Sequence, residues 1–154
     1  MTSSADRMIL EEELLPLVRE RLAAGQKVRY LPFRGVSMLP MLRQGKDAVE
    51  LASLPEKLRK YDLPVYRYPS GKIVMHRVVA VKEDHYICLG DNTYSYEKIY
   101  PEQMIAVVSA FKRGDKRIES DAWLYRLYSR VWYWIYPVRK LAVRGKAWLR
   151  RLLK

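Results

Sequence analysis

Between residues 27 and 113 the chain repeats one pattern, a short β-prone run followed by a turn signal. Val, Ile and Tyr fill the runs, while Gly, Pro, Asp and Asn separate them, as in strands joined by turns. Strands this short and this close together predict a mostly antiparallel β domain. The runs are KVRYLPF, DAVELA, LPVYRY, KIVMHRVVAVK, DHYICLG and MIAVVSAFKR.

Helical patterns flank this β region on both sides. Residues 1–26 carry apolar side chains at helical spacing, which predicts an N-terminal packing helix. Residues 27–120 form the β-rich domain, and residues 121–154 form a helical tail that Pro137 divides. A chain of 154 residues is long enough for one core with such appended elements, and too short for two ordinary domains.

Several classes of protein are disfavoured by the composition. The single cysteine, Cys88, cannot form an internal disulfide, and two histidines give no zinc-ligand spacing, so we expect neither a metal nor a cofactor. Three consecutive glutamates interrupt the most apolar part of the N-terminal helix, which makes it neither a secretory signal nor a membrane span. We expect a protein that is cytoplasmic or peripheral on the membrane.

The segment FRGVSMLPMLRQG, residues 33–45, contains a candidate nucleophile, Ser37. A serine becomes nucleophilic only beside a base, with a donor for the developing oxyanion. Gly35 lets the backbone approach a bound peptide closely, and Pro40 fixes the turn beyond the serine. Taken alone, the segment is a modest signal, because a lone serine in a turn is structural far more often than catalytic.

Downstream runs supply a candidate base and two candidate acids. In KIVMHRVVAV, the alternation of a strand puts His76 on the face opposite Arg77. Asp91 and Glu97 follow in the loop LGDNTYSYEK, just past a strand, where functional carboxylates are common. Each also has a structural interpretation, namely a buried hydrogen-bonded histidine, an Asx turn and a solvated glutamate.

The order of these motifs resembles that of the type I signal peptidase family and the wider set of Ser-Lys and Ser-His proteases, over roughly residues 28–112. The four strings are GVSMLPML, YDLPVYRYPSGKIVMHRVVAV, LGDNTYSYEK and MIAVVSAF. The resemblance implies the β protease fold that signal peptidases share with LexA-like autoproteases. It also implies that the protein is a serine endopeptidase that cleaves a leader or signal peptide.

The resemblance implies a role for each matching residue. Ser37 corresponds to the nucleophile and His76 to the base of the Ser-His branch. Asp91 matches the family's Gly-Asp acid, and Glu97 stands where relatives carry an aspartate that assists the base. Because glutamate has an extra methylene, we favour Asp91 over Glu97 as the residue that orients His76. Residues around the nucleophile would bind substrate or the oxyanion: Gly35, Val36, Met38 and Pro40.

Other positions depart from the family pattern. Met41 stands where a small residue is usual, and Tyr61 stands where glycine is usual. Gly35 has no hydroxyl for the oxyanion, which leaves mainly the Ser37 N–H. These departures keep open a catalytically weak or inactive relative that binds peptides or a membrane. A LexA-like regulator is less compatible, because those autoproteases use lysine as base and need a DNA-binding domain ahead of the protease.

The tail is strongly basic. Residues 121–154 hold nine of the 29 Lys and Arg residues but only one of the 17 acids, Asp121. Helical spacing places one apolar face opposite a basic one, which predicts a basic amphipathic helix. This face either packs on the β domain or docks on an anionic membrane, and nucleic acid is favoured least. The apolar face contains Leu124, Leu127, Val131, Trp134, Ile135, Val138 and Leu141.

Overall fold

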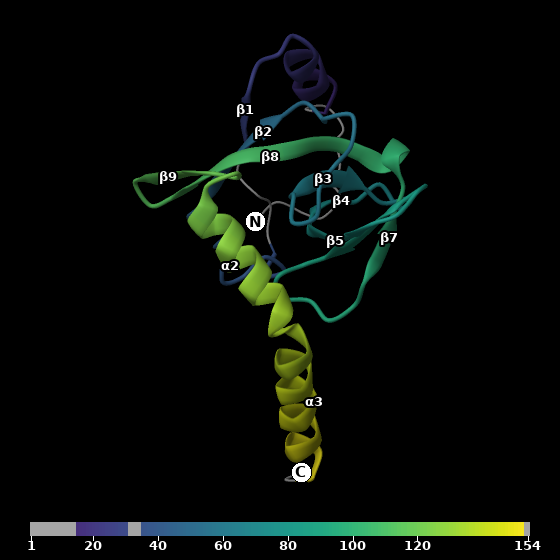
Figure 1. The fold of residues 1–154 in the computed structure, drawn as a ribbon, viewed down its shortest axis with the longest axis vertical. Coiled ribbons are helices and arrows are strands. Elements are labelled where there is room, and N and C mark those ends of the chain that lie inside the picture. The colour runs from purple at the N-terminus through teal and green to yellow at the C-terminus, as the bar shows by residue number, and fades with distance from the viewer. Residues whose placement is uncertain (1–14, 31–34, 153–154) are drawn as a thin grey trace, which may run out of the picture.

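The computed structural model describes residues 15–30 and 35–152. An antiparallel sheet crosses its centre (Figure 1). Its strands are β1 (Val28–Tyr30), β2 (Ala48–Ala52), β3 (Pro64–Arg67), β4 (Ile73–Met75), β8 (Met104–Arg113) and β9 (Lys116–Glu119). Their order is β1-β2-β8-β3-β4, and β9 pairs with the end of β8 as a hairpin. The long strand β8 therefore lies in the middle of this sheet, between β2 and β3.

A second antiparallel sheet packs against the first. It consists of β5 (Arg77–Val81), β6 (Tyr86–Leu89) and β7 (Glu97–Ile99), and a short 3₁₀ helix, η1 (Pro101–Gln103), leads from β7 into β8. Buried side chains from both sheets form a shared core, and they include Tyr66, Val78, Cys88, Ile99 and Met104. The prediction of a mostly antiparallel β fold with flanking helices is confirmed.

A larger core lies on the central sheet and holds the segment around Ser37 in place. Met38, Met41 and Leu42 are all buried there beside strand residues such as Val65. A helix over residues 15–23 contributes Leu22 to the same core. Met41 is thus a packing residue whose large side chain lies in this core.

The run KIVMHRVVAV is two strands rather than one. β4 ends at Met75 in the central sheet, β5 begins at Arg77 in the second sheet, and His76 lies at the crossing. Reciprocal backbone hydrogen bonds tie Val78 to the segment before β3, from Tyr61 N–H to its carbonyl (2.7 Å) and from its N–H to Asp62 (2.9 Å). His76 is therefore fixed where the two sheets meet, and the prediction that it lies within a strand was wrong.

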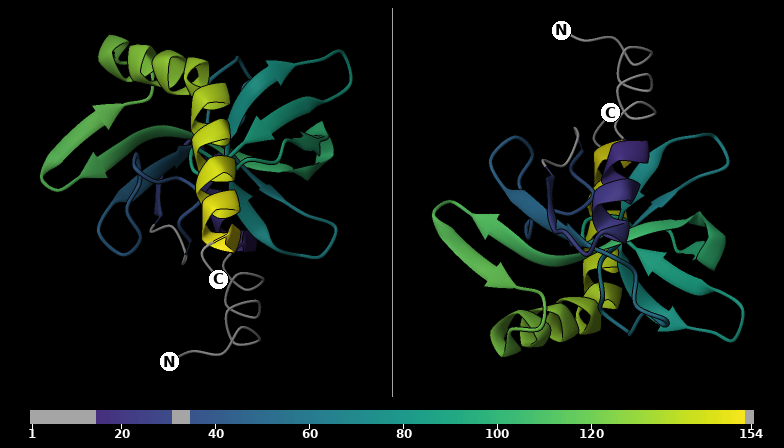
Figure 2. Two further views of the ribbon diagram at one scale, coloured as in Figure 1. Left: turned by 90° about the horizontal axis from the view of Figure 1, so that it is seen from below. Right: turned by 90° about the horizontal axis from the view of Figure 1, so that it is seen from above.

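The tail forms two helices, α2 (Trp123–Trp134) and α3 (Tyr136–Leu152). The break is at Ile135, and Pro137 lies in the first turn of α3, where a missing N–H costs little. The two helices meet at a bend (Figure 2), and α3 extends away from the β domain (Figure 1). Within the described residues, no helix is long and apolar enough to cross a bilayer.

Candidate active site

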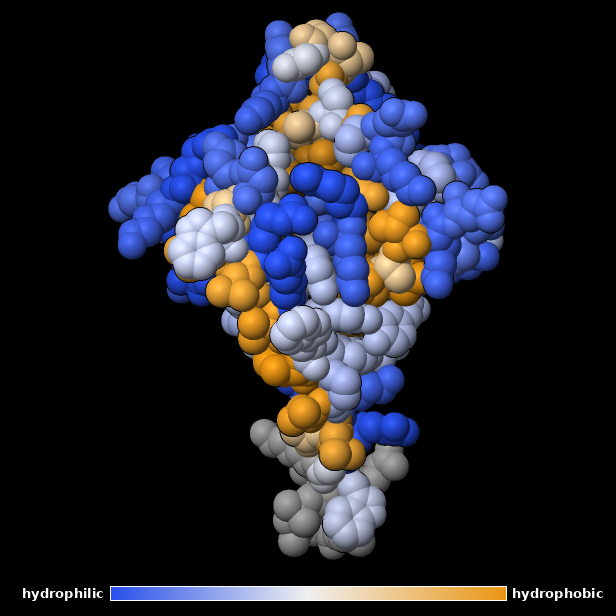
Figure 3. Space-filling view, in the orientation of Figure 1, coloured by the Kyte–Doolittle hydropathy of each residue, from blue (hydrophilic) through white to orange (hydrophobic). Residues whose placement is uncertain are grey.

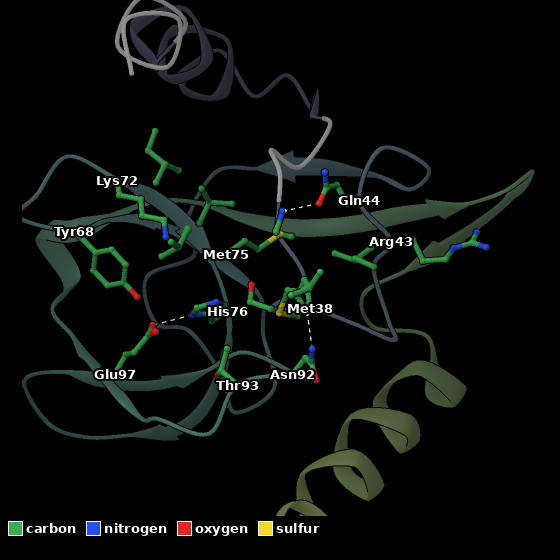
Figure 4. A pocket seen from close by; sticks show the side chains of 17 residues that line it. Met38, Arg43, Gln44, Tyr68, Lys72, Met75, His76, Asn92, Thr93 and Glu97 are labelled. Atoms are coloured by element: carbon green, nitrogen blue, oxygen red, sulfur yellow. Dashed lines mark hydrogen bonds and ion pairs between the residues drawn. The ribbon is translucent and has the colours of Figure 1, made fainter. Parts of the chain in front are cut away.

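A cavity of about 440 Å³ opens between the Ser37 segment, the β3–β4 hairpin and the loop after β6. Figure 4 shows Tyr68 and Glu97 on one side of His76, and Met38 and Asn92 on the other. The lining includes Gly35, Val36, Ser37, Met38, Val65, Tyr68, Lys72, Ile73, Val74, Met75, His76, Asn92, Thr93 and Glu97. Three segments that are distant in sequence therefore meet around one histidine.

His76 is held by a carboxylate at one ring nitrogen. Its Nδ1 lies 2.8 Å from Glu97 Oε2, and the side chain is 6% exposed. The buried hydroxyl of Tyr66 donates to the same oxygen at 2.5 Å and lies 3.1 Å from His76 Nδ1. Burial raises the pKa of Tyr66, so its hydroxyl stays protonated and available as a donor.

Glu97 is ionised in this arrangement. Burial raises the pKa of its carboxyl, but hydrogen bonds from His76, Tyr66 and Tyr68 outweigh burial and hold that pKa below its ordinary value. An ionised Glu97 accepts a hydrogen bond and cannot donate one, which makes Nδ1 the protonated nitrogen of neutral His76. The other nitrogen, Nε2, is then left with a free lone pair.

Gly90 shows how close His76 lies to the Ser37 segment. A Cβ at position 90 would lie 2.8 Å from the Ser37 carbonyl oxygen and 3.0 Å from His76 Cδ2. The Cδ2 atom is bonded to Nε2, so the edge of the ring that faces away from Glu97 is the one near Ser37. The missing side chain of Gly90 therefore lets the backbone of the Ser37 segment lie close to the His76 ring.

Asn92 fixes the Ser37 backbone from the same loop. Its N–H donates to the Ser37 carbonyl at 2.7 Å, and its side-chain amide donates to the Val36 carbonyl at 3.1 Å. Thr93 closes the turn through a hydrogen bond from the Gly90 N–H to its hydroxyl. The GDN motif predicted from the sequence thus contacts the serine segment directly.

Asp91 does not contact His76. Its carboxylate takes two hydrogen bonds from Arg77, Nε to Oδ1 at 2.8 Å and Nη2 to Oδ2 at 2.7 Å, and both side chains are 2% exposed. Arg77 Nη1 also donates to the Tyr125 hydroxyl (2.9 Å) and Ser129 Oγ (2.7 Å) of α2. Our preference for Asp91 as the partner of His76 was therefore wrong, because Glu97 occupies that position.

The remaining predicted residues differ in their placement. Gly35, Val36 and Met38 line the cavity, and Val36 is 58% exposed there. Pro40 is exposed but does not line the cavity, so its assignment to substrate binding is not supported by its position. The Gly35 N–H donates to the Gln44 side chain at 3.1 Å, which removes it as a free donor.

Sequence reasoning missed Tyr66 and Tyr68, which hydrogen-bond to the Glu97 carboxylate. In a strand, side chains two positions apart point to the same face, and Tyr66 in β3 is two positions before Tyr68. That spacing indicates a shared face for the two tyrosines, but the carboxylate that they contact comes from β7, 31 residues beyond Tyr66.

No group of three metal-binding side chains occurs among the described residues.

No model of a known protein family matches this chain, and a search of curated proteins found no match either. The four ordered motifs and the contacts around His76 are therefore the features that indicate a function.

Proposed function

We propose that the protein is a serine endopeptidase that uses Ser37 as nucleophile and His76 as base, assisted by Glu97. One observation carries this proposal. The His76 ring is held at Nδ1 by Glu97, and its Cδ2 atom lies with the Ser37 carbonyl beside Gly90, at the wall of a cavity that Ser37 also lines. A base oriented by a third group beside a nucleophile is the arrangement that serine activation requires.

In the proposed reaction, the Ser37 hydroxyl attacks the scissile carbonyl while His76 Nε2 accepts its proton. The imidazolium that forms is stabilised by the Glu97 carboxylate, and it then donates the proton to the leaving amine. A water molecule, deprotonated by the same nitrogen, hydrolyses the acyl-enzyme and releases Ser37. Glu97 stays ionised throughout, because its hydrogen bonds hold its pKa low.

The oxyanion needs its own donor, and the Ser37 N–H is the candidate. Among the described residues, no hydrogen bond uses this N–H, whereas Gln44 takes the N–H of Gly35. A single backbone donor stabilises a tetrahedral intermediate less than two donors do, so we expect slow turnover.

A leader or signal peptide is the proposed substrate. The cavity wall formed by the β3–β4 hairpin is largely apolar, with Val65, Ile73 and Met75, which suits an extended apolar segment. Lys72 adds a positive charge to the same wall. The class of substrate itself comes from the resemblance to signal peptidases.

A serine-reactive acylating probe tests the proposal by intact-mass analysis of the labelled protein. We expect labelling of the wild type, and loss of labelling in Ser37→Ala and His76→Ala. Ser70→Ala, at an exposed turn, is the matched control and should label normally. Cleavage of leader-peptide substrates, followed by mass spectrometry, should fall by about 10³-fold or more in both site variants. Undiminished labelling or turnover in Ser37→Ala would remove the assignment.

A second candidate function is peptide capture without cleavage. The observation that favours it is the engagement of the Gly35 N–H by Gln44, which leaves the oxyanion poorly supplied with donors. In that case the wild type binds extended peptides, measured by fluorescence anisotropy, while neither probe labelling nor cleavage occurs.

A further inference from the structure

An apolar stripe runs along the outer side of both tail helices. Its members are 39–73% exposed, and Figure 3 shows apolar side chains following α2 and continuing onto α3. We call these residues the outer stripe: Trp123, Leu124, Leu127, Val131, Trp134, Ile135, Val138, Leu141 and Trp148. A surface of this length is unusual on a soluble monomer and marks an interaction site.

The opposite side of α2 is the one that packs on the β domain. Tyr125 and Ser129 accept hydrogen bonds from the buried Arg77. The Trp132 indole donates to the Asp91 carbonyl at 2.8 Å. These polar contacts fix the rotation of α2, because a roll that buried the outer stripe would leave Arg77 without its hydroxyl partners. The apolar face is therefore turned outward by the fold itself.

The start of α3 is fixed in the same way. Arg139 donates to the Asp91 carbonyl and stacks on the Trp132 ring, 3.8 Å from its centre. Tyr136 is buried and contacts Tyr94 in a stacked pair. Helix α2 and the first turn of α3 thus keep a polar and aromatic side on the protein, while the apolar side of both helices faces the solvent, and the packing alternative for the apolar face does not hold.

Charge identifies the partner. The segment from 121 to 154 carries nine basic residues and one acid, and Arg130 and Arg144 are exposed on the two helices. A second copy of this surface would bring like charges together, whereas anionic lipid headgroups would neutralise them. Trp123, Trp134 and Trp148 are the residue type that favours the boundary between headgroups and acyl chains. A nucleic acid would offer the charges but nothing apolar for the outer stripe.

We propose that the outer stripe docks on an anionic membrane surface, with α2 and α3 lying in the interface and their basic side chains on the headgroups. This inference uses contacts and charges outside the cavity, so it holds whether or not the protein is a peptidase. It explains why the contacts of α2 with Arg77 and Asp91 leave an apolar face exposed to the solvent.

Sedimentation of the full chain with lipid vesicles tests this docking. We expect binding to vesicles of equal parts phosphatidylcholine and phosphatidylglycerol, and weak binding to phosphatidylcholine alone. Leu127→Glu with Leu141→Glu should lower the partition coefficient at least tenfold, while Leu54→Glu, at an exposed loop position, should leave it unchanged. Because all three leucines are exposed, each variant should fold normally, and circular dichroism checks that it keeps its helices.

The charges need a separate variant. Arg130→Gln and Arg144→Gln should each lower binding to the anionic vesicles about fivefold, with little effect on phosphatidylcholine vesicles. Equal sedimentation of the wild type and the Leu127→Glu, Leu141→Glu variant would overturn the proposal. So would a wild-type dimer, seen by light scattering, that this variant converts to a monomer, or binding to duplex DNA that exceeds binding to anionic vesicles.

Discussion

Removing the Asp91 carboxylate should strongly destabilise the folded protein, because this carboxylate is the ionic partner of the buried Arg77. In Asp91→Ala the Arg77 guanidinium keeps its charge and is only 2% exposed, yet it loses both hydrogen bonds to carboxylate. Breaking a buried ion pair by removing one partner costs about 3–5 kcal/mol, mainly because the remaining charge stays desolvated. Tyr125 and Ser129 still accept from Arg77 but cannot neutralise it.

Urea unfolding followed by tryptophan fluorescence measures this cost. With a slope of about 2 kcal/mol per molar urea, the midpoint should fall by roughly 1.5–2.5 M. Asp47→Ala is the matched control, because the Asp47 side chain is 0% exposed but its partner Arg43 is 41% exposed and can be hydrated. The control should lose about 1–3 kcal/mol.

The combined variant Arg77→Met, Asp91→Leu separates charge burial from packing. Replacing both members of a buried ion pair by apolar residues is often nearly neutral, so this variant should recover most of the stability lost in Asp91→Ala. The recovery also keeps the prediction testable if Asp91→Ala is unfolded without urea. An Asp91→Ala variant that loses no more than Asp47→Ala would refute the reasoning.

Three further predictions concern the cavity. Glu97→Gln should lower peptide cleavage about 10²-fold or more without changing peptide affinity, because an amide neither stabilises the His76 imidazolium nor fixes its tautomer. The hydrogen bonds that lower the pKa of Glu97 in the folded state stabilise the protein at pH values above the pKa that Glu97 has in the unfolded chain. The difference in unfolding free energy between wild type and Glu97→Gln should therefore vanish as the pH falls below about 4.5 through that lowered pKa, measured by urea titration at each pH. Gly90→Ala should cost about 1–3 kcal/mol in urea unfolding and lower cleavage further, because its Cβ would lie 2.8 Å from the Ser37 carbonyl oxygen.

Each of the six β-prone runs predicted from the sequence contains a strand, because such runs and their turn residues are local signals. Strands β7 and β9 lie outside those runs and were not predicted. The sequence also identified the GDN loop as a candidate part of the site. It did not predict the strand break at His76, because the crossing between sheets depends on the pairing of Val78 with the segment before β3. The choice between the two acids failed for a related reason. Arg77, at the start of β5, binds Asp91. His76, at the crossing, binds Glu97, so each pairing depends on contacts between segments that are distant in sequence.

The orientation of α2 was also beyond the sequence. Its apolar residues form a clear face, and helical amphipathicity ordinarily directs such a face inward. Here the inward side is set by Arg77, a buried cation that needs hydroxyl groups from Tyr125 and Ser129. The hydrogen bonds that buried Arg77 of β5 makes to α2 thus outweigh the local hydrophobic pattern in setting which side of α2 faces the protein. The spacing of residues within α2 does not indicate these bonds.

Three consecutive residues connect the cavity to the tail. Gly90 leaves room for the Ser37 segment beside His76, Asp91 neutralises Arg77, and Asn92 holds the Ser37 carbonyl. The Asp91 carbonyl also receives hydrogen bonds from both tail helices.

Deleting residues 121–154 would therefore not be a clean test of membrane docking. It would remove the hydroxyl partners of Arg77 and the donors to the Asp91 carbonyl together with the outer stripe. A truncated chain that fails to bind vesicles could fail because the loop beside Ser37 has lost its support. Substitutions confined to the outer stripe leave those contacts in place, so they separate docking from the integrity of the cavity.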